Sequence, residues 1–257
     1  GILRRVAVAP PPRQPQRDTL ERKVAVLAFD NLGEGGQPDY LPDGFSEELI
    51  CVLATVPGVR VTARASAFSL RGRNLPPAEI GRQLEVDFLV EGRAGQVAGQ
   101  VQIAARLVRI ADQRILWSDR IERGRNEIPT VRDEFATQIL RALQPALGRV
   151  IGVPPTEEEI RAQVRAAHRG GTRHAEAYHR YLQGRYLNEQ GTGPSYALAT
   201  AALREAIACD PGFALAWSEL ARNQLLLVHA EGIARAEGYE AARRLALRAV
   251  AIEPRLA

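Results

Sequence analysis

The segment around residues 29–44 is the first stretch whose residue types could do chemistry, because glycines follow an apolar run and precede a helical pattern. Phosphate-binding loops begin this way, with backbone N–H groups and a lysine directed at the phosphates. No lysine follows here, and three glycines lie well before the helix pattern starts, too early for a dinucleotide fingerprint: Gly33, Gly35 and Gly36. Acidic residues that would repel a phosphate lie nearby: Glu34, Asp39 and Asp43. We therefore expect a flexible connection without nucleotide, in which Asp43 and Gly44 make the turn into the helix.

Three histidines crowd one short segment and raise the question of a metal site: His168, His174 and His179. No pair has the three- or four-residue spacing that brings two imidazoles to one helix face, and no His-Glu-x-x-His motif occurs. The pattern is more typical of solvated helix histidines. We expect no metal here.

Carboxylates cluster at two predicted helix starts, one with Glu47 and Glu48 and one over residues 156–159. The positive end of a helix dipole explains acidic residues at such positions without any catalysis. Asp39 and Asp43 lack the alternating oxygen ligands of a calcium loop, and neither a nucleophile elbow nor a catalytic-cysteine signature is present. The sequence thus offers no catalytic residue, no metal site and no cofactor site, and we expect a chain that is not an enzyme.

The elements that would position any site begin with an α/β pattern. Residues 24–29 form a continuous apolar run, which is typical of a strand covered on both faces, and residues 59–64 predict a second strand. Between them, residues 43–56 predict a helix capped by Asp43 or Ser46.

The pattern then changes to strands with one covered face. Residues 76–86 predict a short helix, and three alternating runs over residues 87–123 predict an antiparallel meander. Residues 127–150 have the periodicity of an amphipathic helix. Residues 23–150 are therefore predicted to form an α/β domain, with a mixed sheet flanked by helices.

Beyond Pro155 the chain is wholly helical, and it repeats itself. Residues 206–214 have a counterpart in residues 249–257, each with a helix end, an acidic residue and a proline before a new helix. The prolines are farther apart than the roughly 34-residue tetratricopeptide period, so an insertion is expected within residues 231–239. We predict a helical connector over residues 151–171 and an all-α region of tetratricopeptide-type repeats over residues 172–257. Because only two repeats are visible, this is a truncated array.

Residues 1–22 form a Pro- and Arg-rich linker. Six basic residues against two acidic ones give residues 1–23 a net charge of +4, which equals that of the whole chain. The remainder is balanced, so we expect no direct contact with nucleic acid. Two alternatives stay open for the start: the end of a membrane helix lying upstream of Gly1, or a plain linker between domains.

Cys51 and Cys209 each fall at an apolar-periodic position in a predicted helix, far apart in the sequence. That placement favours buried, inert thiols over a disulfide or a metal pair. The cysteines therefore leave the compartment open, either periplasmic or cytoplasmic.

Four motifs follow one another along the first domain: a strand ending in Phe29-x-Asn31, Asp43-Gly44 before the helix, Val90-Glu91-Gly92 and Leu116-Trp117-Ser118. With them, residues 23–150 resemble the TolB amino-terminal-like domain, in the version that bacterial regulators carry just before tetratricopeptide repeats. The resemblance implies a sensory or scaffolding region of a bacterial signalling protein. It also implies an upstream output domain, either winged-helix DNA-binding or class III adenylate/guanylate cyclase, often behind a membrane helix. The chain departs from the family at Ala28 and Cys209.

A tetratricopeptide array has a concave groove lined by the first helix of each repeat, which binds a protein or peptide. The residues at those positions are Tyr178, Tyr181, Arg185, Asn188, Ser218, Arg222 and Leu225. Two tyrosines beside an arginine are suited to a peptide or an acidic partner segment. The alternative is that Tyr181 packs between helices.

Other functions remain open at this point. A small ligand could bind at the carboxyl ends of the strands, near Asn31 and Arg64, where open α/β sheets have their usual crevice. The chain could instead be a homodimerisation device for two output domains, or a soluble adaptor with no output domain at all.

Overall fold

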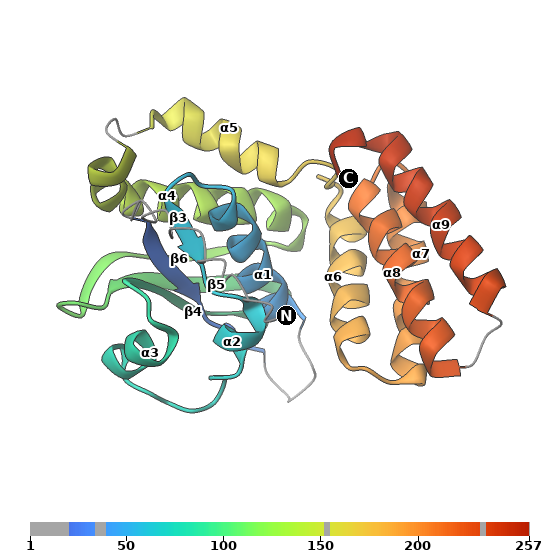
Figure 1. Cartoon of the computed structure of the whole chain (residues 1–257), viewed down its shortest axis with the longest axis horizontal. Helices are drawn as coiled ribbons and strands as arrows, with labels where there is room; N and C mark the ends of the chain where they lie inside the picture. Colours follow the sequence, from blue (N-terminus) through green and yellow to red (C-terminus); the bar gives the residue numbers. More distant parts are fainter. Residues whose placement is uncertain (1–20, 34–39, 152–154, 232–234, 257) are drawn as a thin grey trace, which may run out of the picture.

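The computed structural model describes residues 21–33, 40–151, 155–231 and 235–256. Within them, a mixed α/β unit is followed by a helical region that stands beside it (Figure 1). The predicted fold class, α/β followed by an all-α region, is confirmed at this level. Most of the predicted linker, part of the glycine-rich segment and part of the predicted insertion lie outside the described residues.

The sheet has six strands in the described part of the chain, in the order β3-β1-β4-β5-β6, with β2 paired to β4. β1 pairs in parallel with β3 and β4, whereas β4, β5 and β6 form the predicted antiparallel meander. The strands are β1 (Arg22–Val26), β2 (Asp30–Asn31), β3 (Val59–Val61), β4 (Phe88–Val97), β5 (Gln100–Arg109) and β6 (Arg114–Gly124).

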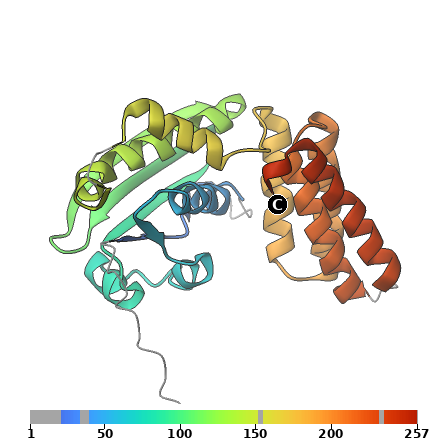
Figure 2. The ribbon, with the colours of Figure 1, turned by 45° about the horizontal axis from the view of Figure 1, so that its top comes forward.

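Helices cover the two faces of the sheet unequally (Figure 2). On one face, α1 packs over β3 and β4, α4 packs over β5 and β6, and alternating side chains of β5 such as Ile103 and Leu107 point into the main core that they form. On the other face, α3 covers a smaller cluster around Leu89 and Val108. These helices are α1 (Leu41–Ala54), α2 (Arg64–Phe68), α3 (Pro77–Leu84) and α4 (Ile128–Ile151), the last preceded by a 3₁₀ turn, η1 (Arg125–Glu127).

Helix α1 begins earlier than the sequence predicted. It starts at Leu41 with Pro42 in its first turn, so neither Asp43 nor Ser46 caps it. Ser46 lies inside the helix instead, where its hydroxyl donates to the carbonyl of Pro42 and accepts from the backbone N–H of Phe29, each at 2.9 Å. The side chain that was expected to cap the start of the helix therefore joins the helix to the segment that follows β1. The second predicted strand is also shorter, since Arg64 already begins α2.

The helical region contains five α-helices in the described residues and ends in a 3₁₀ turn. They are α5 (Glu157–Ala167), α6 (Ala175–Glu189), α7 (Gly193–Cys209), α8 (Ala214–Glu231) and α9 (Arg235–Ile252), followed by η2 (Pro254–Leu256). α6 packs along α7, α8 along α9, and α7 along α8 (Figure 1). The acidic run at residues 157–159 does occupy the first turn of α5, where Thr156 and Glu159 form a capping box.

Small residues allow these helices to approach closely, as a glycine in α6 illustrates. A Cβ added at Gly184 would lie 2.6 Å from Cγ of Leu203 on α7. We expect Gly184→Val to destabilise the chain by about 1–3 kcal/mol, the usual cost of overpacking. Chemical unfolding measures this, with Ala201→Val on the exposed face of α7 as the control. A Gly184→Val protein as stable as that control would contradict the packing.

Both cysteines are exposed, so the prediction of buried thiols is wrong. Leu49, Val52 and Leu53 direct the apolar face of α1 into the core, and Cys51 lies between them on the other side. Cys209 is the last residue of α7, beyond the packed part of that helix. The chain thus carries one accessible thiol on each of its two parts.

Among the described residues, no helix combines the length and the apolar character needed to cross a membrane.

Candidate functional site

The two acidic residues of α1 lie at the junction with the helical region. Glu47 and Glu48 are only 8% and 5% exposed, and they sit in the second turn of α1 instead of at its start. The interpretation of this pair as a helix-dipole feature is therefore wrong. A carboxylate removed from water at such a position is costly unless cations and hydrogen bonds compensate it.

Glu47 is compensated by two arginines from different parts of the chain. Nε of Arg64 on α2 lies 2.5 Å from its Oε1, and the guanidinium of Arg185 on α6 contacts its Oε2. Burial raises the pKa of Glu47, and the two arginines offset that effect only in part.

Glu48 is held by cations from three helices. Nε2 of His168 lies 3.1 Å from its Oε2, Nη1 of Arg132 lies 3.9 Å from the same oxygen, and Nη1 of Arg185 lies 3.7 Å from its Oε1. Burial alone would raise the pKa of Glu48, but these cations outweigh it and hold that pKa below its ordinary value. The carboxylate is therefore ionised at neutral pH and binds α4, α5 and α6 to α1.

His168 connects this carboxylate to a second one. Its Nδ1 lies 3.0 Å from Oδ1 of Asp133 on α4, and only 6% of its side chain is exposed. Burial would lower the pKa of His168, but Asp133 and Glu48 outweigh burial and raise it. The prediction of solvated histidines is thus wrong for His168. It is also wrong for His179, which is buried against the ring of Tyr40.

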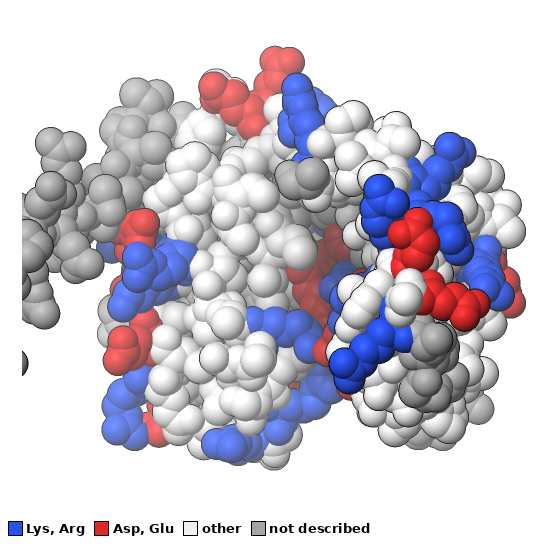
Figure 3. All heavy atoms as spheres, turned by 45° about the vertical axis from the view of Figure 1, so that its right-hand side comes forward, with Lys and Arg blue, Asp and Glu red and all other residues white. Residues whose placement is uncertain are grey.

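The charge network continues into the helical region. Nη1 of Arg64 lies 3.1 Å from Oε2 of Glu189 at the end of α6, and Nη2 of Arg222 on α8 lies 3.2 Å from Oε1 of the same residue. Charges of alternating sign thus run from α4 through α1, α2 and α6 to α8. Figure 3 shows acidic and basic side chains gathered in the furrow between the two parts of the molecule.

The structure divides the predicted groove residues into two groups. Tyr178, Tyr181 and Asn188 are buried, and Arg185 faces α1. Tyr178 lies under the guanidinium of Arg132 from the α/β unit, whereas Asn188 bonds to Glu219 and Asn223 of α8. Tyr181 packs against Phe213 with ring centroids 4.8 Å apart, as the alternative for this residue proposed. The residues that remain exposed all lie on α8: Ser218, Arg222 and Leu225.

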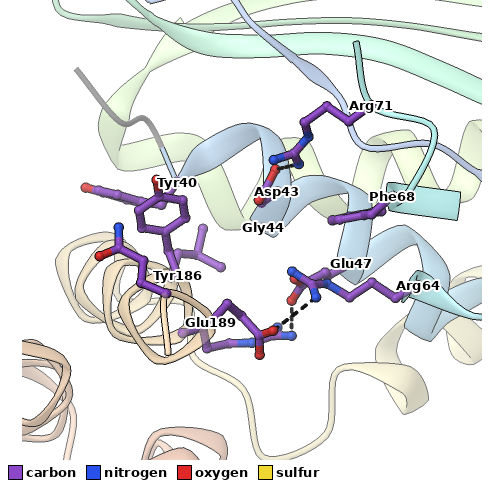
Figure 4. Close-up of a pocket in the computed structure, with 12 residues that line it drawn as sticks. Tyr40, Asp43, Gly44, Glu47, Arg64, Phe68, Arg71, Tyr186 and Glu189 are labelled. Atoms are coloured by element: carbon purple, nitrogen blue, oxygen red, sulfur yellow. Dashed lines mark hydrogen bonds and ion pairs between the residues drawn. The ribbon is translucent and has the colours of Figure 1, made fainter. Parts of the chain in front are cut away.

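A cavity of about 280 Å³ lies beside the network, between α1, α2 and α6 (Figure 4). Arg64, one of the two predicted ligand-binding residues, lines it, and its guanidinium lies 4.6 Å from the ring centroid of Phe68. Arg71 stacks on the same ring and pairs with Asp43. Asn31 is not among the residues that line this cavity; its side-chain oxygen accepts a hydrogen bond from the backbone of Gly33.

The acid–base network could not be found from motif spacing, because its members come from distant segments. The one signal in the sequence was Glu47 and Glu48 inside an otherwise apolar helix pattern, where buried acids require cations. Despite these carboxylates and His168, no group of three or more acidic, histidine or cysteine side chains in the described part of the chain is arranged to hold a metal ion.

No protein-family model matches the chain. The chain is 30% identical over 215 residues to "Putative adenylate cyclase 3" of Rhizobium meliloti. That alignment covers 84% of this chain and 34% of the relative, so this chain spans about a third of the length of the relative that it matches.

Similar solved structures are distant. TolB from Acinetobacter baumannii has a TM-score of 0.37 and 15% identity, with 52% of this chain and 29% of that chain covered. Lipoprotein GNA1162 from Neisseria meningitidis has a TM-score of 0.35 and 18% identity, with 46% and 95% covered. The LpoB C-terminal domain from Salmonella enterica has a TM-score of 0.30 and 13% identity, with 42% and 87% covered.

Proposed function

We propose that this chain is a non-catalytic regulatory region of a bacterial signalling protein, whose α/β unit and helical region act as one body on an output domain elsewhere in the parent protein. The observation that carries this proposal is the buried charge network between the two parts. The Rhizobium meliloti relative, which is more than twice as long as this chain, supports the proposal. Its alignment leaves only 42 of the 257 residues of this chain unmatched, and helices α6 to α9 together contain more residues than that. The similarity must therefore extend over both parts.

The name of the Rhizobium meliloti relative supports a nucleotide cyclase as the output domain of the parent protein. A winged-helix DNA-binding domain, which the family resemblance also implies, is the alternative. In either case this region would control the output without taking part in the reaction.

The helices α6 to α9 are proposed to be two tetratricopeptide-type units. Their pairing into successive hairpins supports this, as do Gly184 and the buried alanines at the helix contacts, such as Ala199 and Ala206. We further propose that the two units use their groove differently. The first holds the α/β unit through Arg185, whereas the second offers Ser218, Arg222 and Leu225 on α8 to a protein or peptide partner.

The test compares two charge reversals in the full-length parent protein. Arg185→Glu places a third carboxylate beside Glu47 and Glu48 and should change the output, measured as cyclic nucleotide formed or as promoter occupancy. Arg204→Glu makes the same change on the exposed face of α7 and should leave the output as in the wild type. If Arg185→Glu opens the junction and the output stays unchanged, the proposed function is wrong.

A second candidate function is a small-ligand sensor, which the cavity beside Arg64 favours. Its walls carry both signs of charge around the ring of Phe68, with carboxylates from Asp43 and Glu189 and guanidinium groups from Arg64 and Arg71. In this structure Arg71 pairs with Asp43 and Arg64 with Glu189, and a small zwitterion would bind by taking these groups as partners for its own two charges. Calorimetric titration of the wild type and Phe68→Ala with free amino acids tests this, and the sensor reading fails if none gives a binding signal in the wild type.

Two further proposals rest on the sequence. The region is proposed to dimerise, which would bring two cyclase domains together, and a membrane helix is proposed to precede Gly1, which would make this the far-side sensor of an anchored protein. Sedimentation of the chain tests the first proposal. The sequence upstream of Gly1 in the parent gene tests the second, with a polar linker favouring a cytoplasmic adaptor.

A further inference from the structure

His168 is placed where the two parts of the molecule join. It caps the C-terminal end of α5, and both of its ring nitrogens lie against carboxylate oxygens from other helices, at 3.1 Å for Glu48 and 3.0 Å for Asp133. Neither nitrogen makes a well-aligned hydrogen bond to these oxygens, so the two contacts are ion pairs by proximity. A neutral imidazole carries a proton on one nitrogen only, so the lone pair of its other nitrogen would lie close to an anion. The geometry therefore suits the doubly protonated, charged ring.

The groups around His168 depend on that positive charge. Glu48 faces it from α1, and Arg132 and Asp133 face it from α4. From α6, Arg185 reaches Glu48, and the ring of Tyr178 lies 5.0 Å from the guanidinium of Arg132. With His168 neutral, Glu48 and Asp133 would share Arg132, while Arg185 is already engaged by Glu47. Two buried carboxylates would then be left with too little positive charge.

The segment after His168 leads directly into the repeats. The carbonyl of Gly170 accepts a hydrogen bond of 2.9 Å from the backbone N–H of Leu215 at the start of α8. Two residues further on, the Thr172 hydroxyl donates to Oδ2 of Asp210 at 2.5 Å. A displacement of His168 would therefore be passed on to the helical region.

We propose that His168 is a pH-sensitive latch that joins the α/β unit to the helical region when it is charged and releases that junction when it is neutral. Its regulatory meaning rests on the proposed function, but the latch itself is a property of this chain alone.

The direction of the pH dependence follows from the ion pairs that His168 makes with Glu48 and Asp133. Because Asp133 and Glu48 raise the pKa of His168, the latch is fully closed below the ordinary histidine value of about 6.5 and opens as pH rises through the raised value. The pKa values of Glu48 and Asp133 are lowered, so their contribution is lost only in acid. Opening is therefore expected between neutral and mildly alkaline pH.

The two native cysteines provide the measurement. Cys51 lies on α1 and Cys209 on α7, and both thiols are accessible to spin labels. Electron–electron double resonance on the wild-type chain should give a narrow distance distribution at pH 6 and a broader one at pH 9. His168→Gln should give the same distribution at both pH values, because glutamine does not titrate. As a control, His229→Gln changes an exposed histidine of α8 and should retain the wild-type response to pH.

A wild-type distribution that is equal at pH 6 and pH 9 would overturn the latch, and so would a full pH response in His168→Gln. If His168→Gln does not fold, the titration of the wild-type His168 ring by NMR decides instead. A pKa above 6.5 supports the latch, and one at or below 6.5 overturns it. Neither readout needs an output domain, so the latch and the proposed function can fail separately.

Discussion

Glu48→Ala is expected to lower the free energy of unfolding by about 3–5 kcal/mol, which is the usual cost of removing one partner from a buried ion pair. The loss is large because Glu48 is shared by His168, Arg132 and Arg185, and because Arg132 is only 5% exposed. Without this carboxylate, the cations of α4 and α5 have Asp133 alone. Urea unfolding monitored by circular dichroism measures the difference.

Glu158→Ala is the matched control, because Glu158 is an exposed acid in α5. Its effect should stay within about 0.5 kcal/mol, as for most surface substitutions. Glu48→Gln keeps the shape of the side chain and loses its charge, so it should resemble Glu48→Ala if charge is what matters. A cost below about 1 kcal/mol for Glu48→Ala would mean that the cations find other partners.

Arg185→Glu should separate the α/β unit from the first helical hairpin. The arginine contacts Glu47 and lies 3.7 Å from Oε1 of Glu48, so reversal of its charge would bring three carboxylates together. Loss of about 3–5 kcal/mol at the contact corresponds to roughly a hundredfold or more in the opening equilibrium. Hydrogen exchange should therefore become faster by that factor in both α1 and α6.

The position of the faster exchange separates an opened junction from general destabilisation. β4 and β5, which lie in the sheet core, should keep their protection, and so should α9 in the second hairpin. Arg204→Glu should leave all of these elements unchanged. Equal acceleration throughout the chain would contradict a local role for Arg185.

The fold class could be predicted because its signals are local. Val101, Ile103, Ala105 and Leu107 alternate with less buried residues, and they do form one buried face of β5. Helix starts were less predictable. Asp43 has the residue type of a helix cap, but α1 already begins at Leu41, with Pro42 in its first turn. Glu47 and Glu48 therefore lie inside the helix and not at its start.

The junction could not be predicted, because its partners are brought together by the tertiary structure. Arg185 was predicted to bind a peptide or an acidic partner segment, and in this structure it pairs with Glu47 on α1 of the same chain. His168 was interpreted as solvated because spacing cannot reveal that Glu48 and Asp133 converge on it. The prediction that Cys51 is buried was wrong for a related reason. An apolar periodicity does not show whether a residue at the edge of the apolar face of a helix is buried or exposed.

The central claim is that the α/β unit and the helical region form one body, and scanning calorimetry of the isolated chain at pH 6 tests it most directly. One cooperative transition is expected, with equal calorimetric and van't Hoff enthalpies, because the network from α4 to α8 makes each part depend on the other. Arg185→Glu should split this transition into two. Two independent transitions in the wild-type chain would contradict the account.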